Sequence, residues 1–425
     1  MPSRGTSPNG ADRPATGLLG GDPPGRDLLA DARRLTRKLA RRVRGIERRV
    51  VRLEPAGRPR GRILFSYVLD PLLEPREAPV DRTHTHFWES RQMAWALVDA
   101  GWAVDAVHWT NHRFVPELAY DAVLDVRTNL ERWVGRLPSS TLRLFHCDTA
   151  HWSFNNRAEK QRLDELAERR GIVLAPHREM PPNRGIELAD HGTYLGNEFT
   201  RSTYREWGTP MTRIPVSVPC TYDWQQGKDF EAARRRFLWF GSGGLVHKGL
   251  DLVLEAFAEM PDLELVVAGP IRRERDFARA FRHELYELPN VETVDWVDVA
   301  SARFVEICRG SVGLVYPSCS EGGGSSALTC LHAGLIPVLT REASVDLDPA
   351  WGVELETASV EEIQARVREL AERPAGELEE MARGAWEWVR AHHTREVFAE
   401  AWRRFTEELT GGRLRGAVTF DRNLE

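Results

Sequence analysis

Lysine is scarce in this sequence. Only four of its 58 basic residues are lysines, namely Lys38, Lys160, Lys228 and Lys248, and the others are arginines. The net charge of −5 leaves no basic excess, so the composition gives no indication of nucleic-acid binding. Because lysine is so rare in this sequence, chance alone does not explain the presence of Lys248 inside a glycine-rich loop.

Cysteine is also scarce, and it is scattered. The five cysteines are an odd number without any C-x-x-C spacing: Cys147, Cys220, Cys308, Cys319 and Cys330. This pattern argues against a disulfide scaffold and against a zinc site, and it suits a reducing cytoplasm.

Long apolar runs are missing as well. No run approaches the ~20 residues that a helix needs to cross a membrane, and the first residues lack the apolar core of a signal peptide. We therefore expect a cytoplasmic protein. Residues 1 to about 26 are rich in proline, glycine and serine, so we expect them to be disordered.

A basic amphipathic helix is predicted for residues 28–53. Apolar side chains recur there at steps of three and four, at Leu28, Ala32, Leu35, Leu39, Val43, Ile46, Val50 and Leu53. Arginines occupy the other face. Such a helix can lie on an anionic membrane surface, form a short coiled coil or pack on its own domain, and all three remain open. A peripheral position at the inner membrane face is therefore one expectation.

Strands alternate with helices from residue 61 onward. The predicted strands of the first half are 62–68, 103–109, 121–126 and 141–146, and its predicted helices are 91–100 and 156–169. This alternation indicates a parallel sheet with helical crossovers, and ligands bind beyond the carboxyl ends of such strands. The mouth of this sheet should collect four histidines that follow strands: His84, His86, His146 and His151.

A second alternating series begins at residue 236, after a polar segment, 212–235, that we interpret as a link between domains. Its predicted strands are 236–240, 263–268, 291–297, 312–316 and 336–340. Its predicted helices are 250–260, 274–288, 301–308 and 325–333, followed by the wholly helical region 360–409. A chain of 425 residues suits two such domains.

The stretch 317–340 carries the clearest functional signal. Glu321 is followed by Gly322, Gly323 and Gly324 at the start of a predicted helix. A helix N-terminus has unpaired N–H groups and a partial positive charge, which suit phosphate, and glycines let the backbone approach a ligand. A carboxylate beside such a place indicates a ligand with both phosphate and hydroxyl groups, such as a nucleotide sugar. The alternative is a plain helix entry with a flexible turn.

Several motifs of the second half resemble a known family. They are Phe-Gly-Ser-Gly-Gly-Leu-Val-His-Lys-Gly from residue 240, Leu-Glu-Leu-Val-Val-Ala-Gly from 263, Ser-Glu-Gly-Gly-Gly from 320 and His-Ala-Gly-Leu-Ile-Pro-Val from 332. Their order and spacing resemble the donor half of a retaining GT-B glycosyltransferase of the Glu-x7-Glu group, similar to family 4. The resemblance covers roughly residues 236–405, and the first half fits more loosely.

The resemblance implies roles for the residues in these motifs. Lys248 would contact the diphosphate of the donor, and Glu321 would contact the donor sugar. Gly243 and Gly244 would let their loop meet the diphosphate, and the segment from Gly322 to Ser325 would cover the phosphates. A dinucleotide site is the competing interpretation of these glycines, although their spacing departs from G-x-G-x-x-G.

Two positions depart from the family pattern. The second glutamate of the motif, which would bind the ribose hydroxyls, is replaced by Thr329. A threonine can form hydrogen bonds but does not accept from two hydroxyls as a carboxylate does. The family also pairs its lysine with a second cation in the same loop, where this sequence offers only His247. Arg272 or Arg273 is an alternative source of that charge.

The resemblance also implies a histidine that contacts the sugar. His146 ends a predicted strand as that histidine does, and His84, His86 and His151 are further candidates on the acceptor side. His84 and His86 have no evident third metal ligand, and we interpret the Asp346-Leu-Asp348 segment as a loop. We therefore expect neither a metal nor a cofactor.

We expect two Rossmann-like α/β domains that face each other across a cleft, the GT-B fold. The expected boundaries are 1–60 for the tail and basic helix, 61–215 for the acceptor-side domain, 216–395 for the donor domain and 396–425 for a helix that returns to the first domain. The expected function is retaining transfer of a sugar from a UDP- or GDP-linked donor to an acceptor hydroxyl. A sugar-nucleotide epimerase and a catalytically degenerate partner subunit are the alternatives.

Overall fold

Two β-sheets organise the computed structural model, which describes residues 45–82 and 84–412. The first sheet has seven strands in the described residues. In spatial order they are β1 (Val50–Leu53), β3 (Ala103–His108), β2 (Arg62–Tyr67), β4 (Ala122–Asp125), β5 (Leu142–Cys147), β6 (His191–Tyr194) and β7 (Met211–Arg213). All neighbours pair in parallel except β1, which is antiparallel to β3.

The second sheet has six strands, and all its described pairs are parallel. In spatial order they are β10 (Val291–Asp295), β9 (Glu264–Ala268), β8 (Arg236–Phe240), β11 (Gly313–Tyr316), β12 (Ile336–Thr340) and β13 (Val353–Leu355). Strands such as β11 and β12 are buried along their whole length, as expected where helices cover both faces of a parallel sheet.

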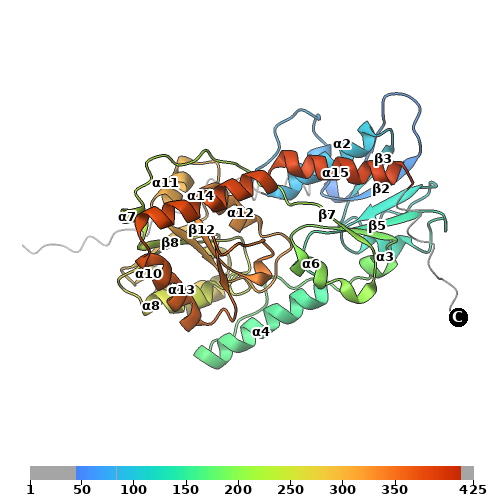
Figure 1. Ribbon diagram of the computed structural model, residues 1–425. Coiled ribbons are helices and arrows are strands. Elements are labelled where there is room, and N and C mark those ends of the chain that lie inside the picture. Colours follow the sequence, from blue (N-terminus) through green and yellow to red (C-terminus); the bar gives the residue numbers. More distant parts are fainter. Residues whose placement is uncertain (1–44, 83, 413–425) are drawn as a thin grey trace, which may run out of the picture. The chain divides into compact units, whose positions relative to one another are not determined.

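Helices connect the strands of both sheets (Figure 1). Those of the first half are α2 (Thr85–Asp99), α3 (Asn129–Trp133), α4 (Trp152–Arg170), α5 (Gly185–Leu188) and α6 (Glu198–Ser202). Those of the second half are α7 (Phe230–Ala233), α8 (Leu250–Ala258), α9 (Arg275–Ala280), α10 (Arg282–Tyr286), α11 (Ala302–Arg309), α12 (Ser325–His332), α13 (Val360–Glu372), α14 (Ala375–His392) and α15 (Arg395–Thr410). Among the described residues, no helix is both long and apolar enough to pass through a bilayer.

The prediction of one helix over residues 28–53 is wrong at its C-terminal end. Residues 28–44 lie outside the described part of the chain. Residues 46–48 form a short 3-10 turn, and Val50–Leu53 forms strand β1, so the first sheet begins before the expected boundary at residue 61. The β-branched Val50 and Val51 fit a strand edge, and pairing with β3 satisfies the backbone there. The membrane-surface hypothesis for this segment stays a prediction for the residues before 45.

Other differences concern short or interrupted elements. Strands β6, β7 and β13 were not predicted, because three or four residues carry too little periodicity. The predicted helix 274–288 is divided into α9 and α10 at Phe281. The helical region 360–409 is three helices, and Pro374 separates the first two because proline cannot continue a helix.

Helix α15 returns to the first sheet and packs along α2 (Figure 1). The indole N–H of Trp402, a fully buried side chain, donates to the carbonyl of Met93 at 3.1 Å. At the other end of α15, the indole N–H of Trp102 donates to Thr410 Oγ1 at 3.1 Å. The last helix therefore belongs structurally to the first domain.

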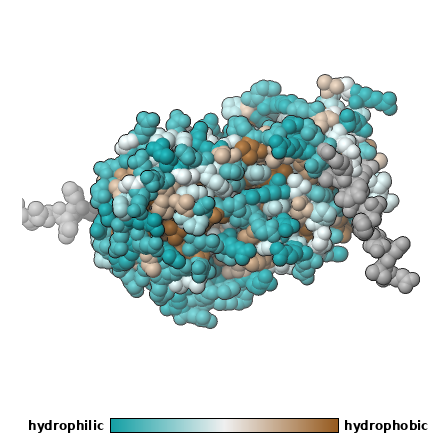
Figure 2. All heavy atoms as spheres, viewed as in Figure 1, coloured by the Kyte–Doolittle hydropathy of each residue, from teal (hydrophilic) through white to brown (hydrophobic). Residues whose placement is uncertain are grey.

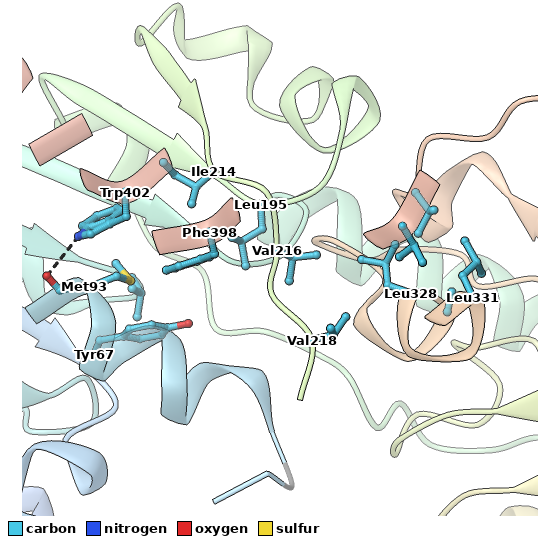
Figure 3. Packing of buried hydrophobic residues seen from close by; sticks show 14 of the residues in the cluster. Tyr67, Met93, Leu195, Ile214, Val216, Val218, Leu328, Leu331, Phe398 and Trp402 are labelled. Carbon is cyan, nitrogen blue, oxygen red and sulfur yellow. Dashed lines mark hydrogen bonds between the residues drawn. The ribbon is translucent and has the colours of Figure 1, made fainter. Parts of the chain in front are cut away.

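One hydrophobic core cluster extends from the first sheet into the second (Figure 3). Met93 and Trp402 lie at one end of it, and Leu328 and Leu331 of α12 lie at the other. Val216, from the segment that links the two sheets, lies between them. Continuous burial of this kind holds the facing edges of the sheets at a set separation.

Helix α4 provides a second, polar connection between the two halves. Arg169 donates to Asp251 Oδ2 at 2.9 Å, and Arg170 donates to Glu284 Oε1 at 2.7 Å. Arg162 donates to the carbonyl of Pro317 at 3.0 Å, at the start of the stretch 317–340. A helix that follows β5 of the first sheet thus positions a loop of the second.

Candidate functional site

A cavity of about 260 Å³ lies where the carboxyl ends of the two sheets face each other. From the first sheet it is lined by residues at the ends of β2, β4 and β5, including Tyr67, Arg127 and Asp148. From the second it is lined by Lys248 and by the stretch from Ser320 to Ser326. This is the position at which open parallel sheets bind ligands, because the loops that follow the strands gather there.

Lys248 and Glu321 form a buried ion pair in this cavity. Lys248 Nζ donates to Glu321 Oε1 and, at 2.7 Å, to the hydroxyl of Tyr316, and its side chain is only 3% exposed. Burial would raise the pKa of Glu321, but Lys248 and the neighbouring cations outweigh it and lower the pKa to about 2. Glu321 is therefore ionised at neutral pH.

The two oxygens of the Glu321 carboxylate have different surroundings. Oε1 accepts from Lys248, from Tyr316 at 2.7 Å and from Ser318 at 3.0 Å. Oε2 accepts no hydrogen bond from any residue that the structure describes, and Glu321 lines the cavity. One oxygen thus anchors the side chain while the other can accept from a ligand hydroxyl.

The glycines after Glu321 allow the two sheets to approach each other. A Cβ on Gly322 would lie 2.2 Å from the carbonyl oxygen of Asp148 and 2.4 Å from the Cα of Thr149, so only glycine fits this contact. Gly324 caps α12 with a φ of 57°, which favours glycine. Ser325 and Ser326 begin α12 at the cavity wall, where the first N–H groups of the helix are unpaired.

Together with Tyr67, Arg127 and Asp148, Arg178 is one of the cavity residues that sequence reasoning missed. Its backbone N–H donates to Glu159 Oε1 at 2.8 Å, and its carbonyl accepts from Asn155 at 2.8 Å, so α4 holds the loop in place. Its guanidinium lines the cavity and makes no hydrogen bond or ion pair with a described residue. Burial lowers the pKa of Lys248, Glu321 opposes that effect, and the charge of Arg178 lowers the pKa further. No motif surrounds Arg178 in the sequence, so only the fold brings it here.

Gly244 lies in close contact with Arg178. A Cβ there would lie 2.3 Å from Cγ of Arg178, so the glycine makes room for the arginine. The carboxylate of Glu274 binds the backbone N–H groups of Gly244 and, at 3.0 Å, of Leu245. Glu274 therefore occupies the N–H groups of Gly244 and Leu245, whereas Ser242 of the same loop lines the cavity. The expectation that the loop of Gly243 and Gly244 meets a diphosphate stays a prediction. Glu274 follows β9 by several residues, and sequence spacing cannot show that it reaches this loop.

The residues expected to supply a second cation do not do so. His247 Nε2 donates to the carbonyl of Ser320 at 2.6 Å, and burial lowers the pKa of His247 to about 3, so the ring is neutral at pH 7. Arg272 pairs with Asp295 at 3.1 Å, and neither Arg272 nor Arg273 lines the cavity. Arg178 and Arg127 are the other cations that line the cavity with Lys248.

Thr329 lies inside α12 rather than on the cavity wall. It is 2% exposed, and its hydroxyl donates to the carbonyl of Ser325 at 2.7 Å. Thr329, which stands in place of the second glutamate of the motif, thus makes its hydrogen bond within the helix.

Of the four histidines predicted at the mouth of the first sheet, the structure brings two to the cavity. His84 and His86, at the start of α2, line it. His151 caps α4 and lies against Trp207, with ring centres 4.0 Å apart and ring planes inclined at 36°, and it does not line the cavity. His146 is fully buried behind Tyr67, with ring centres 5.7 Å apart, and its Nδ1 shares a hydrogen bond of 2.8 Å with Thr193 Oγ1. His146 can therefore position Tyr67 but does not reach a ligand in the cavity.

A polar network surrounds His86 on the first-sheet side. Its Nδ1 lies 2.6 Å from the hydroxyl of Tyr67 and 3.1 Å from Glu89 Oε2, and its Nε2 lies 3.6 Å from Asp148 Oδ2. Asp148 also accepts from Arg127 Nη1. Burial would raise the pKa of Asp148, but Arg127 outweighs it and the pKa is lowered, so the carboxylate is ionised. Hydroxyls of a ligand would find both donors and acceptors here.

The buried His146 predicts a pH dependence of stability. Burial lowers the pKa of His146 to about 4, whereas the unfolded chain protonates a histidine near 6.5. Stability should then fall as the pH drops from about 6.5 to 4, by up to about 3 kcal/mol for this residue. In His146→Asn, the loss of unfolding free energy between pH 7 and pH 5, measured with urea, should be smaller than in the wild type. His112→Asn, at an exposed histidine, is the control, and an unchanged pH dependence in His146→Asn would contradict the prediction.

Among the described residues, no group of three or more histidine, cysteine, aspartate or glutamate side chains is placed to hold a metal ion. Charged side chains line the cavity between the sheets. Three cations (Arg127, Arg178 and Lys248) and two carboxylates (Asp148 and Glu321) line it, which leaves a positive balance suited to an anionic ligand.

Comparisons with known proteins bear on the fold. No protein-family model matches the chain, and no curated protein sequence does. Among solved structures, a sucrose-phosphate synthase from Thermosynechococcus elongatus matches 83% of this chain and 100% of its own, with a TM-score of 0.56 and 15% identity. HepE of Anabaena, solved with UDP and glucose, matches 82% and 99%, with a TM-score of 0.52 and 10% identity.

The N-terminal domain of a Candida albicans trehalose-6-phosphate phosphatase matches 84% of this chain and 99% of its own, with a TM-score of 0.51 and 8% identity. Sequence identities this low concern the fold alone, and each match covers nearly the whole of the other chain. The prediction of the fold class is confirmed: two Rossmann-like α/β domains face each other across a cleft, and the chain has the GT-B fold.

Proposed function

We propose that this protein is a retaining glycosyltransferase. It would move a sugar from a UDP- or GDP-linked donor to an acceptor hydroxyl, in the synthesis of a glycan, a glycolipid or a glycosylated metabolite. The observation that carries the proposal is the cavity between the sheets, where Arg178 and Lys248 lie beside Glu321 and the start of α12.

The cations suit the diphosphate of the donor. Negative charge builds up on a diphosphate as the bond to the sugar breaks, and charged donors aimed at that position lower the barrier. The guanidinium of Arg178 has no hydrogen-bond or ion-pair partner among the described residues, and its planar fork matches phosphate oxygens. Lys248 Nζ adds a second charge, and the first N–H groups of α12, at Ser325 and Ser326, add donors on the same wall.

The carboxylates suit the hydroxyls of the sugar. Glu321 Oε2 is free to accept while Oε1 is anchored, so the side chain can hold a hydroxyl without losing its position. Asp148 and His86 face the cavity from the first sheet and offer further partners. HepE, which shares the fold, was solved with UDP and glucose, and a ligand of that chemical class fits this set of charges.

The transfer can proceed without a protein nucleophile. The bond between the anomeric carbon and the phosphate oxygen breaks while the acceptor oxygen attacks from the same face. The acceptor proton passes to the departing phosphate oxygen, so configuration is retained and the charges balance. In this scheme Lys248 and Arg178 stabilise the leaving group, and Glu321 orients the sugar.

Nucleotide binding tests the proposal most directly. UDP, GDP and ADP, with uridine as a control without phosphate, should be screened for thermal stabilisation of the full chain. A ligand at 100 times its Kd stabilises the folded state by about 2.7 kcal/mol, so one diphosphate should raise the melting temperature by several degrees. Uridine should have little effect, because the cations have no phosphate to bind. The proposal fails if no nucleoside diphosphate shifts the transition.

The reaction class then follows from the products. Nucleotide sugars that bind should release nucleoside diphosphate faster when an acceptor is present. Release of the free nucleotide without any acceptor dependence would favour an epimerase, and binding without any turnover would favour a degenerate partner subunit.

A further inference from the structure

The buried side of α4 is mostly polar. Its buried residues are Asn155, Glu159, Arg162 and Leu166, so three of the four carry hydrogen-bonding groups. Hydrophilic residues cover the lower edge of the molecule in Figure 2, where α4 lies in Figure 1. A surface helix usually buries an apolar stripe, and buried polar groups are costly unless they find partners. The partners of these three side chains therefore indicate what the helix holds in place.

The loop 171–184 follows α4 and contains Arg178. No helix or strand forms within it, so contacts with side chains must fix the position of Arg178. Asn156 accepts from the N–H of Met180 and donates to its carbonyl, both at 2.8 Å. Asn155 donates to the carbonyl of Arg178 at 2.8 Å. The helix thus holds the centre of the loop that follows it.

Glu159 has the central place in these contacts. Its Oε1 accepts from the N–H groups of His177 at 2.9 Å and Arg178 at 2.8 Å, and its Oε2 accepts from the N–H of Arg178 at 3.1 Å. Glu159 is only 2% exposed. Burial raises its pKa, and the two backbone N–H groups and the charge of Arg178 oppose that effect. A buried carboxylate is costly, and here the backbone of one loop supplies its partners.

The side chain of Arg178 reaches the second half of the molecule. It lies so close to Gly244 that a Cβ there would be 2.3 Å from Cγ and 2.8 Å from Cδ of Arg178. The residue lines the cavity together with Lys248 and Glu321, which both belong to the second half. A cation carried by the first half is thereby placed beside the charged wall of the second.

Arg162 of the same helix face contacts the other side of the cavity. It donates to the carbonyl of Pro317 at 3.0 Å, and Pro317 begins the stretch that contains Glu321. The buried face of α4 therefore contacts both the loop of Arg178 and the loop of Glu321.

We propose that Glu159 is a positioning residue of the donor site. It holds the backbone of Arg178 so that the first half of the molecule supplies a cation to a diphosphate bound on the second half. Glu159 does not line the cavity and acts through Arg178. A displacement of about 1 Å matters there, because a two-pronged contact with phosphate oxygens needs one orientation of the guanidinium. The description of the ligand as a nucleoside diphosphate rests on the proposed glycosyltransferase function.

Calorimetric titration of the full chain with UDP, GDP and inorganic pyrophosphate tests the proposal. Glu159→Ala should weaken diphosphate binding by about tenfold, and by no more than Arg178→Ala does, because the cation remains but its loop is released. Glu159→Gln keeps one oxygen that can accept from the N–H groups of the loop and should recover part of the affinity. Asn156→Ala removes the two hydrogen bonds to Met180 and should also weaken binding, which keeps the test decisive if Glu159→Ala does not fold.

A double variant separates this role from a general loss of stability. If Glu159 acts through Arg178, Glu159→Ala should not weaken binding further in a protein that already carries Arg178→Ala.

Glu362→Ala is the matched control. Glu362 also accepts from backbone N–H groups of a loop, those of Glu356 and Thr357 at 2.8 Å and of Ala358 at 2.9 Å, and none of these residues lines the cavity. The variant should lose stability in urea and bind UDP as the wild type does.

Three results would overturn the proposal. The first is an unchanged diphosphate affinity in Glu159→Ala, or in Asn156→Ala if Glu159→Ala is unfolded. The second is a full additional loss when Glu159→Ala is combined with Arg178→Ala. The third is an equal loss of affinity in Glu362→Ala, which would show that lower stability is the cause.

Failure here is distinguishable from failure of the proposed function. If the wild type binds UDP or GDP and Glu159→Ala binds it equally well, only the positioning role fails. If the wild type binds pyrophosphate but no nucleotide, and Glu159→Ala weakens that binding, the glycosyltransferase proposal fails while the role of Glu159 stands. Both proposals fail if the wild type binds none of the three ligands.

Discussion

Lys248→Met and Glu321→Gln should each reduce release of nucleoside diphosphate from the donor by about two to three orders of magnitude. Loss of one group that stabilises developing charge typically has an effect of that size. Lys248 faces the leaving diphosphate in the proposed reaction, and Glu321 holds both the sugar and Lys248 Nζ. The decrease should appear mainly in kcat, because charge on the diphosphate develops in the transition state.

The same two variants should be linked in stability. Lys248 is 3% exposed, so removal of Glu321 leaves a buried charge without a counter-ion, at a cost of about 3–5 kcal/mol. The double variant removes both charges and should cost less than the sum of the single losses. Urea unfolding of the four proteins measures this coupling in a double-mutant cycle.

Lys228→Met is the matched control. Lys228 is the other buried lysine of the second domain, and it donates to the carbonyls of Cys308 at 3.0 Å, Ser311 at 2.6 Å and Gly334 at 3.1 Å. It does not line the cavity. This variant should lose stability but, where it is folded, retain donor turnover. Turnover preserved in Lys248→Met, or lost equally in Lys228→Met, would refute the assigned roles.

Arg178→Ala should weaken nucleoside diphosphate binding by about tenfold to a hundredfold. The guanidinium is the one cation of the cavity's described wall without a carboxylate partner, so its full donor capacity is available to phosphate. The side chain makes no hydrogen bond within the described residues, so folding stability should change little. Calorimetric titration with UDP and GDP measures the affinity, and urea unfolding measures the stability.

Two variants separate the charge of Arg178 from general effects on its loop. Arg178→Lys should recover part of the affinity, because the charge remains but the planar fork is lost. Arg184→Ala removes an exposed arginine from the same loop, where it pairs with Glu187 at 2.8 Å, and should bind UDP as the wild type does. An unchanged affinity in Arg178→Ala would show that the diphosphate does not lie beside Arg178.

Elements with strong periodicity could be predicted from the sequence, and weak ones could not. The strands that became β2, β8 and β12 are buried apolar runs, and a run of that kind has few alternatives in an α/β protein. The sequence predicts the end of a helix where strand β1 forms, because Val50 and Leu53 also fit a helical step of three. The strand forms because residues 50–53 pair with β3, which lies at the edge of the sheet without them.

The candidate site divides in the same way. Lys248 and Glu321 stand in motifs with recognisable glycine spacing, and the structure brings them into contact. Arg178 and Asp148 do not stand in a recognisable motif. They reach the cavity because α4 orders the loop after it and because β5 ends opposite Gly322. Contacts between residues far apart in the chain depend on how the sheets face each other, which local patterns do not encode.

By itself the sequence determined two α/β series, the link between them, and a lysine and a glutamate in loops that follow strands, because periodicity and turn chemistry act over a few residues. Tertiary structure alone decided which charges share the cavity. It brought Arg178 to the cavity wall, paired Arg272 with Asp295 and buried His247. It also occupied the N–H groups of Gly244 and Leu245 with Glu274 and placed His146 in the core. Burial and neighbouring charge set what each of these groups can do, and both are properties of the packed molecule.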